Sequence, residues 1–368
     1  MWVDNEEKRQ TIMRVKLLLA LSLFCPAIIS GQKFTNYFNG EPDCYDSFMS
    51  GIFRFAISDT LNMEVCLITS QNVDGEIIIP ENVISPDNKK YTVTSIASQA
   101  FWNLDSITSI IIPESVIEIG SFAFSGCSRL SGIRISANVD VGDGRLFWEC
   151  DSLKTAGPIG SGCNFEFGWA DTIPERIFNY CFNEVILPEG ITEIPYEAFS
   201  SSPVEKVSLP STLLSIREKA FMSAKRLKSI VVPNSVKAIG TLAFAFCDSL
   251  ESVVLSNKIE QIPDACFKQC KSLDNIIIPG SVVSIGQLAF EGCAFKSVIL
   301  TDNLVSISEQ AFCECDSLRD IFNYSLSPQL ICDDTFIECH NVVLHVKQGC
   351  HETYRSSLWS RFIIKDDI

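Results

Sequence analysis

The residues of this sequence best suited to chemistry are its 16 cysteines and three histidines. The histidines fall late in the chain among cysteines, and this group comprises Cys332, Cys339, His340, His345, Cys350 and His351. Thiolates and imidazole nitrogens bind zinc, and a cysteine paired with a histidine is a candidate nucleophile. The spacing, however, matches no zinc module, and nothing supplies an oxyanion site or a third orienting group. We therefore expect no catalytic residue, metal or cofactor, and retain a zinc site or a Cys/His-dependent enzyme near the C-terminus as a minor alternative.

Composition and motifs argue against several other function classes. The sequence contains no glycine-rich phosphate loop, no Gly-x-Ser-x-Gly motif and no pair of metal-binding histidines spaced along one helix. Acidic residues outnumber basic ones by 45 to 29, which gives a formal net charge of −16. Because nucleic acids and anionic lipids both attract basic surfaces, we expect neither as a partner.

The elements that position these side chains are repeats, and phenylalanine marks them. Eleven phenylalanines, most of them preceded by a small residue, recur at steps of 23, 23, 31, 21, 22, 23, 23, 23, 22 and 24 residues. They are Phe101, Phe124, Phe147, Phe178, Phe199, Phe221, Phe244, Phe267, Phe290, Phe312 and Phe336. An isoleucine lies five residues earlier in ten of the units, and a short β run, often closed by proline, follows each phenylalanine. Such a period predicts a solenoid, in which each unit buries its apolar face only by stacking on its neighbours.

Half of the cysteines occupy one position of this repeat, three residues after the phenylalanine. They are Cys127, Cys150, Cys181, Cys247, Cys270, Cys293, Cys315 and Cys339. We expect a ladder of buried free thiols, because parallel side chains are poorly placed for disulfides between units, which remain the alternative. Six further cysteines lie off the repeat pattern: Cys44, Cys66, Cys163, Cys313, Cys332 and Cys350. The sequence leaves their disulfide state open, and a bridge between Cys44 and Cys66 is one possibility.

The repeat unit Ile-Gly-x-x-Ala-Phe-x-x-Cys-x-x-Leu-x-x-Ile-x-Ile-Pro resembles the BspA-like leucine-rich repeat family. One unit shows the match at Ile119-Gly120, Ala123-Phe124, Cys127, Leu130, Ile133 and Ile135. The fold class expected is a mostly β repeat solenoid, a right-handed superhelix with a parallel sheet and short helical or irregular return segments. The resemblance implies a bacterial surface or secreted protein, sometimes linked to host attachment and extracellular-matrix binding.

The chain divides into four expected segments. They are a signal peptide (1–30), an N-terminal β cap (31–92), the solenoid of about eleven 23-residue units (93–347) and a C-terminal cap (348–368). The signal is indicated by Arg14-Val15-Lys16 before an apolar run that is too short to span a bilayer. We therefore expect a secreted or cell-surface protein with no transmembrane span after signal removal. The 31-residue step contains an insertion near residues 157–171, which we expect to form a loop.

Strand periodicity predicts which side chains face outward from the solenoid sheet. The residue two before the proline position points away from the core, and the apolar members proposed for partner binding are Ile186, Val231, Val254, Ile277, Ile299 and Phe322. Polar residues border this row, as at a protein interface, although valine and isoleucine also favour strands for their own sake. We therefore expect a protein-binding protein, with adhesion to host or matrix proteins through the sheet face as its specific form. A structural scaffold of a cell-envelope assembly is the alternative.

Overall fold

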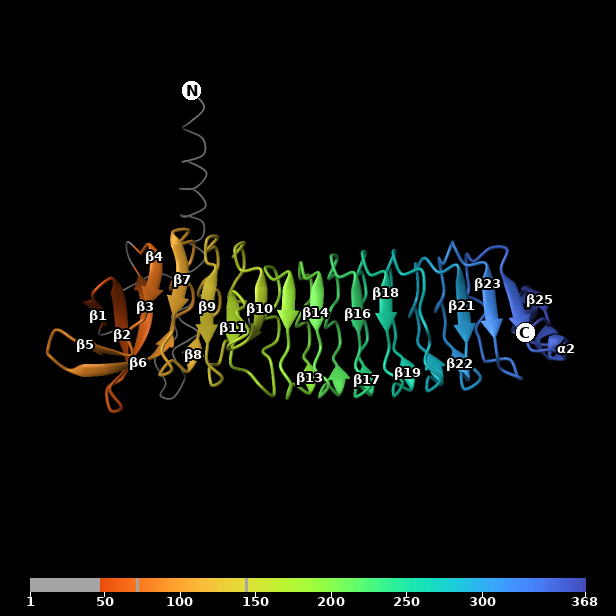
Figure 1. Ribbon diagram of the computed structural model, residues 1–368, viewed down its shortest axis with the longest axis horizontal. Helices are drawn as coiled ribbons and strands as arrows, with labels where there is room; N and C mark the ends of the chain where they lie inside the picture. The colour runs from red at the N-terminus through yellow and green to blue at the C-terminus, as the bar shows by residue number, and fades with distance from the viewer. Residues whose placement is uncertain (1–46, 71–72, 143–144) are drawn as a thin grey trace, which may run out of the picture.

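The β runs of successive repeats lie side by side along one face of a long rod (Figure 1). The computed structural model describes residues 47–70, 73–142 and 145–368, so the signal peptide expected at 1–30 and Cys44 lie outside the described residues. In order along the rod the strands are β4 (Gly75–Ile78), β7 (Ile107–Ile111), β9 (Gly132–Ile135), β11 (Phe165–Phe167), β10 (Thr155–Pro158), β12 (Glu184–Ile186), β14 (Lys206–Ser208), β16 (Ser229–Val231), β18 (Ser252–Val254), β21 (Ser297–Leu300), β23 (Asp320–Asn323), β24 (Val343–Val346) and β25 (Ile363–Lys365). Paired neighbours in this series run parallel, which confirms the expected repeat solenoid.

A second row of two-residue strands runs along another side of the rod. These are β8 (Glu118–Ile119), β13 (Glu193–Ile194), β15 (Ser215–Ile216), β17 (Ala238–Ile239), β19 (Gln261–Ile262), β20 (Ser284–Ile285) and β22 (Ser306–Ile307). Each ends on the isoleucine that precedes the repeat phenylalanine, and its neighbours pair in parallel. That isoleucine is buried, so the second row closes another side of the core.

The return segments form a third ladder of backbone hydrogen bonds between units. In one unit Lys219, Phe221 and Ser223 each donate a backbone N–H to the next unit, over 2.7–3.0 Å. Lys219 and Ser223 have φ angles of 57° and 60°, a left-handed conformation that costs about 1–2 kcal/mol per residue outside glycine. The inter-unit hydrogen bonds offset this cost, so the return segment keeps its shape only within the stack.

Stacked phenylalanine rings form the centre of the core. From Phe178 to Phe336 each repeat ring lies over the next, with centroids 4.7–5.6 Å apart and planes within 23°. All of these rings are fully buried. Burial of an aromatic side chain and its stacking both favour folding, so the regularly spaced phenylalanines stabilise the rod along its length.

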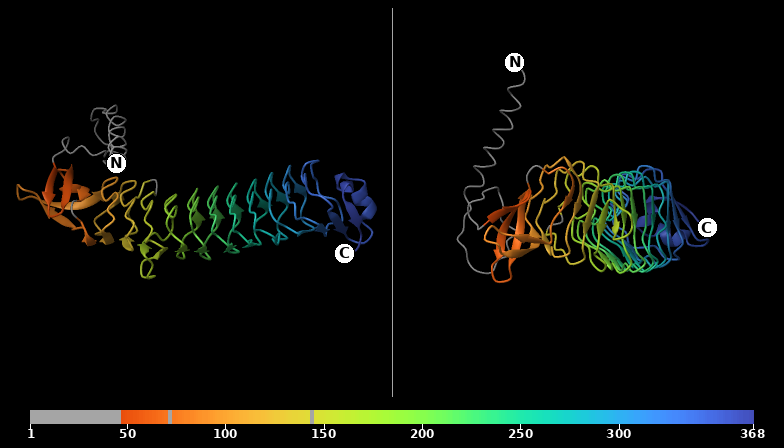
Figure 2. Two further views of the ribbon diagram at one scale, coloured as in Figure 1. Left: turned by 90° about the horizontal axis from the view of Figure 1, so that it is seen from above. Right: turned by 60° about the vertical axis from the view of Figure 1, so that its left-hand side comes forward.

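The 31-residue step between Phe147 and Phe178 contains an extra strand, which corrects the loop expected near residues 157–171. The chain forms β10, turns through residues 159–164, and enters the sheet again as β11 between β9 and β10, parallel to both. Only the turn projects from the rod (Figure 2). The expectation was wrong because the additional residues join the sheet and satisfy their backbone hydrogen bonds there.

Additional aromatic side chains fill the volume under this extra strand. Phe165 lies 4.9 Å from Phe147 and 5.6 Å from Phe182, and Phe182 lies 5.9 Å from Phe178. At this point the sheet gains the extra strand β11, and the phenylalanine stack is divided into two parts. Phe165 and Phe182 bridge these two parts. The core therefore remains continuous through the insertion.

The N-terminal end of the rod is covered by a mixed β sheet. It comprises β1 (Ser47–Ser50), β2 (Phe53–Asp59), β3 (Glu64–Ser70), β5 (Asn82–Ile84) and β6 (Lys90–Ile96). The strand order is β1-β2-β3-β6-β5, in which β3 and β6 pair in parallel. The β2–β3 hairpin turns where Asp59 accepts the backbone N–H groups of Leu61 and Asn62. Phe53 packs edge-on against Phe101, with ring centroids 6.4 Å apart, and so covers the first ring of the stack.

The C-terminal end is covered by α2 (His351–Arg355), a 3-10 helix (Leu358–Arg361) and β25. Trp359 and Phe362 pack against Phe336 with ring centroids 5.6 and 5.3 Å apart. The indole N–H of Trp359 donates to the carbonyl oxygen of Gln329 over 3.0 Å. Across residues 47–70, 73–142 and 145–368, no helix is both long and apolar enough to span a bilayer.

Candidate functional site

The outward row predicted on the sheet face is exposed over most of its length. The exposed fractions are 36% for Ile186, 63% for Val231, 57% for Val254, 76% for Ile277 and 48% for Ile299. The alternating neighbours Ile230 and Val232 are buried at 3% and 2%. Val231, Val254, Ile277 and Ile299 occupy consecutive repeats, and we call these four residues the apolar stripe.

Small polar side chains border the apolar stripe. Ser229, Ser252, Asn275 and Ser297 are exposed on the same face, two residues before each stripe member. The structure assigns no strand to residues 276–278, contrary to the β run expected there. Ile277 nevertheless points outward between two buried isoleucines, so the stripe is not interrupted. The result is an apolar line bordered by small polar side chains, which is a favourable composition for a protein contact.

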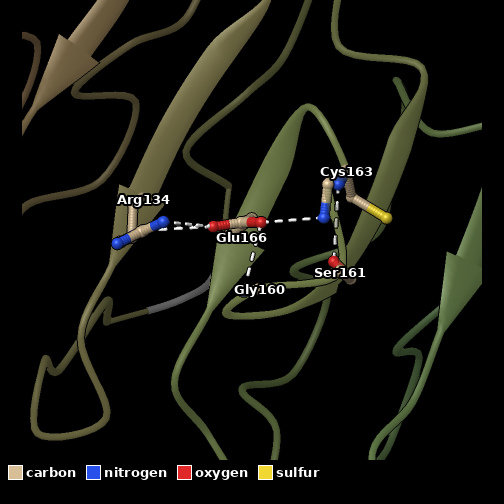
Figure 3. A network of polar contacts seen from close by, with 6 residues as sticks. Arg134, Gly160, Ser161, Cys163 and Glu166 are labelled. Carbon is tan, nitrogen blue, oxygen red and sulfur yellow. Dashed lines mark hydrogen bonds and ion pairs between the residues drawn. The ribbon is translucent and has the colours of Figure 1, made fainter.

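An ion pair lies on the sheet face to the N-terminal side of the stripe, with β10, β12 and β14 between them. Arg134 and Glu166 stand opposite each other on β9 and β11, and Arg134 donates to Glu166 Oε2 from Nη2 (2.7 Å) and Nε (3.1 Å). Glu166 Oε1 accepts the backbone N–H groups of Gly162 (2.9 Å) and Gly160 (3.2 Å), which holds the projecting turn against the sheet (Figure 3). The Gly162 hydrogen bond and Arg134 outweigh desolvation and lower the pKa of Glu166.

The outward row ends differently from what alternation predicts. Phe322 is half-buried and stacks on His345, with ring centroids 4.6 Å apart, and His345 is buried at 9% exposure. His345 Nδ1 lies 2.8 Å from Asp367 Oδ1, and Nε2 lies 3.0 Å from Asp320 Oδ1. The period-two alternation of the strand also places His345 in the outward row and so predicts that it faces solvent. This prediction is wrong, because side chains from β23 and from the C-terminal segment close over the ring.

The repeat cysteines hydrogen-bond one unit to the next. Seven of the eight thiols donate to the carbonyl oxygen of the preceding unit's phenylalanine, over 3.0–3.2 Å, as Cys270 does to Phe244. In the unit where serine replaces cysteine, Ser202 makes the same bond to Phe178 over 2.9 Å. Burial raises the pKa of Cys127 to about 11, so its thiol stays protonated and able to donate.

The other cysteines and the histidines do not converge on a site. In the described part of the chain Cys66, Cys163, Cys313, Cys332 and Cys350 are free. Cys44 lies outside the described residues. Within that described part, no three His, Cys, Asp or Glu side chains form a group suited to a metal ion.

Sequence reasoning missed the polar pairs that limit the sheet face. Arg134 and Glu166 lie 32 residues apart, and His345 lies 25 residues from Asp320. The available signal was that the charged or titratable side chains of Arg134 and His345 stand in the outward row. Their partners became evident only once the strand order was known.

A parallel sheet with a period near 23 residues, closed by short return segments, defines a class of protein: the leucine-rich repeat solenoid. The chain belongs to the BspA type leucine-rich repeat family. The family model matches six copies, over residues 80–158, 168–274 and 237–357, and so covers more than half of the chain.

Several solved bacterial structures are similar to this chain. A leucine-rich cell surface protein of Faecalibacterium prausnitzii A2-165 is 20% identical over 88% of this chain and 98% of that chain, with a TM-score of 0.40. The pneumococcal vaccine antigen PcpA is 20% identical with the same coverages and a TM-score of 0.45. A leucine-rich repeat protein of Bacteroides ovatus ATCC 8483 is 22% identical over 83% and 86%, with a TM-score of 0.38. No curated protein matches the chain.

Proposed function

We propose that this protein is a non-catalytic, extracytoplasmic bacterial protein that binds a partner protein through the apolar stripe. The observation that carries the proposal is the line of four β-branched side chains, 48–76% exposed, on consecutive repeats. Solenoids commonly use their extended faces for binding, and a contiguous apolar patch with a polar border is typical of an interface.

The shape of this face supports a protein partner over a small molecule. Small-molecule sites are concave and enclose most of their ligand. Two hollows in the described part of the chain, of about 340 and 380 Å³, both lie away from the stripe, one between residues 137–142 and 169–174, the other between residues 196 and 241. The stripe itself runs along the outer face of the rod, over the paired strands β16 and β18, the extended segment at residues 276–278, and β21.

The partner we propose is a host or extracellular-matrix protein, which makes adhesion the specific function. The signal peptide expected at residues 1–30 and the family's leucine-rich repeats support an extracytoplasmic location. A scaffold role within a cell-envelope assembly is the other candidate, because the same stripe would serve an envelope protein equally well.

Affinity capture with the full chain tests the proposal. The bait variant carries Val231→Asp, Val254→Asp and Ile277→Asp, and the matched control carries Val283→Asp and Val305→Asp, which lie on the side of the rod that carries the second row of strands and are 40% and 57% exposed. We expect the control, but not the stripe variant, to retain a protein from a mixture of matrix proteins and envelope extract, with unchanged far-ultraviolet circular dichroism. Equal capture by both variants would refute the stripe as the binding surface, and capture from envelope extract alone would favour the scaffold.

A further inference from the structure

Two tryptophans project from the return segments of the first and third repeats. Trp102 is 47% exposed and Trp148 is 46% exposed. Backbone hydrogen bonds hold the repeat between them in register, from Asn103 N–H to Ser125 O (2.9 Å) and from Gly126 N–H to Trp148 O (2.7 Å). The two indoles therefore occupy equivalent positions two repeats apart, which is about 10 Å at the usual strand spacing.

The fold itself does not require tryptophan at this position. The other units carry Ser125, Asn179, Ser200, Met222, Ala245, Lys268, Glu291, Cys313 and Ile337 there. Small, charged and aliphatic residues therefore all suit the return segment. Two half-exposed indoles leave apolar surface in contact with water, although the packing of the return segment does not require tryptophan there. Exposed apolar surface of this kind is typical of a contact site.

The repeat between the two indoles contributes a small, inward-turned side chain and one aromatic ring. The Ser125 hydroxyl donates to the carbonyl oxygen of Trp148 over 3.0 Å, and the Asn103 amide occupies the space above the adjacent Gly126. Phe122, from the same repeat, meets Trp148 edge-on with ring centroids 6.2 Å apart. The Arg145 guanidinium lies 5.1 Å from the Phe122 ring centre. We call Trp102, Phe122 and Trp148 the aromatic patch.

The chemistry of the aromatic patch suits a sugar chain. A pyranose ring packs a face of C–H groups on an aromatic ring and directs hydroxyl groups outward from its edge. Side chains that bond hydroxyls surround the patch: the Asn103 amide, which lies over Gly126, and the exposed Arg145 and Glu149. In an extended β-1,4-linked glycan, alternate rings present the same face, so two indoles at equivalent repeat positions suit alternate rings of such a chain.

The area of the patch is too small for a protein partner. An aromatic side chain buries about 150–250 Å² in full, so three partly exposed rings offer roughly 300 Å². A stable protein interface needs about 800 Å² from each partner. A few sugar rings, in contrast, are covered by such an area.

We propose that the aromatic patch is a binding site for an extended β-1,4-linked hexopyranose glycan, separate from the apolar stripe. Each indole packs against the face of one sugar ring. The two sugar rings so bound are alternate rings of the chain, which have the same orientation. Asn103, Arg145 and Glu149 bond the hydroxyl groups along the edge of the chain.

Isothermal titration calorimetry of the full chain with cellohexaose, chitohexaose and maltohexaose tests this site. We expect binding of at least one β-1,4-linked hexamer and at least tenfold weaker binding of the α-linked maltohexaose. Trp102→Ala and Trp148→Ala should each weaken binding of the β-linked hexamer at least tenfold. Ile337→Ala, at the same repeat position and 41% exposed, should leave it unchanged.

Three outcomes would overturn the proposal. They are binding of neither β-1,4-linked hexamer, equal binding of maltohexaose, or wild-type affinity in the Trp102→Ala/Trp148→Ala double variant. Circular dichroism establishes that each variant is folded, which we expect because both indoles lie on the surface. The stripe variants of the preceding section should bind the hexamer normally, so the two proposals fail independently.

Discussion

His345 should make the C-terminal end of the rod sensitive to pH. Its two ring nitrogens face carboxylates from different elements, Asp320 on β23 and Asp367 after β25, at 3.0 and 2.8 Å. Lys365 on β25 stands opposite His345 in the strand register. Both nitrogens donate only when the ring is protonated, so the imidazolium joins β23 and β24 to the C-terminal segment.

The size of the effect follows from the exposure of the two carboxylates. Burial alone lowers the pKa of His345, but the hydrogen bonds and charges of Asp320 and Asp367 outweigh it, and the pKa is raised above 6.5. The Asp320 and Asp367 side chains are 42% and 48% exposed, so solvent screens each pair. We assign about 1 kcal/mol to each exposed pair, and therefore about 2 kcal/mol to the protonated state.

The sign of the pH dependence follows from the raised pKa. The stabilisation is fully present below the unfolded-state pKa near 6.5 and is lost as pH rises through the folded-state pKa. Hydrogen exchange at the β25 amides should therefore be about tenfold or more faster at pH 8.5 than at pH 5.5, after correction for intrinsic rates. His345→Gln should remove this difference. Slower corrected exchange at pH 8.5, or a wild-type difference that persists in His345→Gln, would refute the reasoning.

Two further predictions concern the core. Phe244→Ala should lower the free energy of unfolding by about 3–5 kcal/mol, because the ring is fully buried between Phe221 and Phe267. As a control, Met222→Ala should lower it by less than about 1.5 kcal/mol, because Met222 is partly exposed. Similar urea midpoints for the two variants would contradict the importance of the ring stack. Cys270→Ala should lower the free energy of unfolding by about 1–2 kcal/mol, because it leaves the Phe244 carbonyl oxygen without its thiol donor. Cys270→Ser should lower it by less, because Ser202 makes the same hydrogen bond in another unit. An equal loss for both substitutions would exclude the hydrogen bond as the reason for the ladder.

The sequence was sufficient for features that repeat. Regular spacing placed Phe221 and Phe244 in one stack, because a solenoid brings equivalent positions of adjacent units together. Period-two alternation likewise placed Val231 outside and Ile230 inside. These predictions succeeded because each depends only on local periodicity and on the stacking of like units.

Features that depart from the repeat could not be predicted in the same way. The entry of β11 between β9 and β10 depends on which strand the chain pairs with after its turn, and periodicity does not specify that choice. His345 is buried by side chains from other elements, so its position on a strand did not reveal its environment. Glu166 pairs with Arg134 only because β11 is an additional strand beside β9.

The most direct test of the account is the affinity of the stripe variant for the captured partner. Surface plasmon resonance should compare the wild type, the Val231→Asp/Val254→Asp/Ile277→Asp variant and the Val283→Asp/Val305→Asp control. Burial of an uncompensated charge costs at least about 1.4 kcal/mol at an interface, so we expect Kd to rise tenfold or more for the stripe variant alone. A Kd within twofold of wild type for the stripe variant would contradict the sheet face as the binding surface.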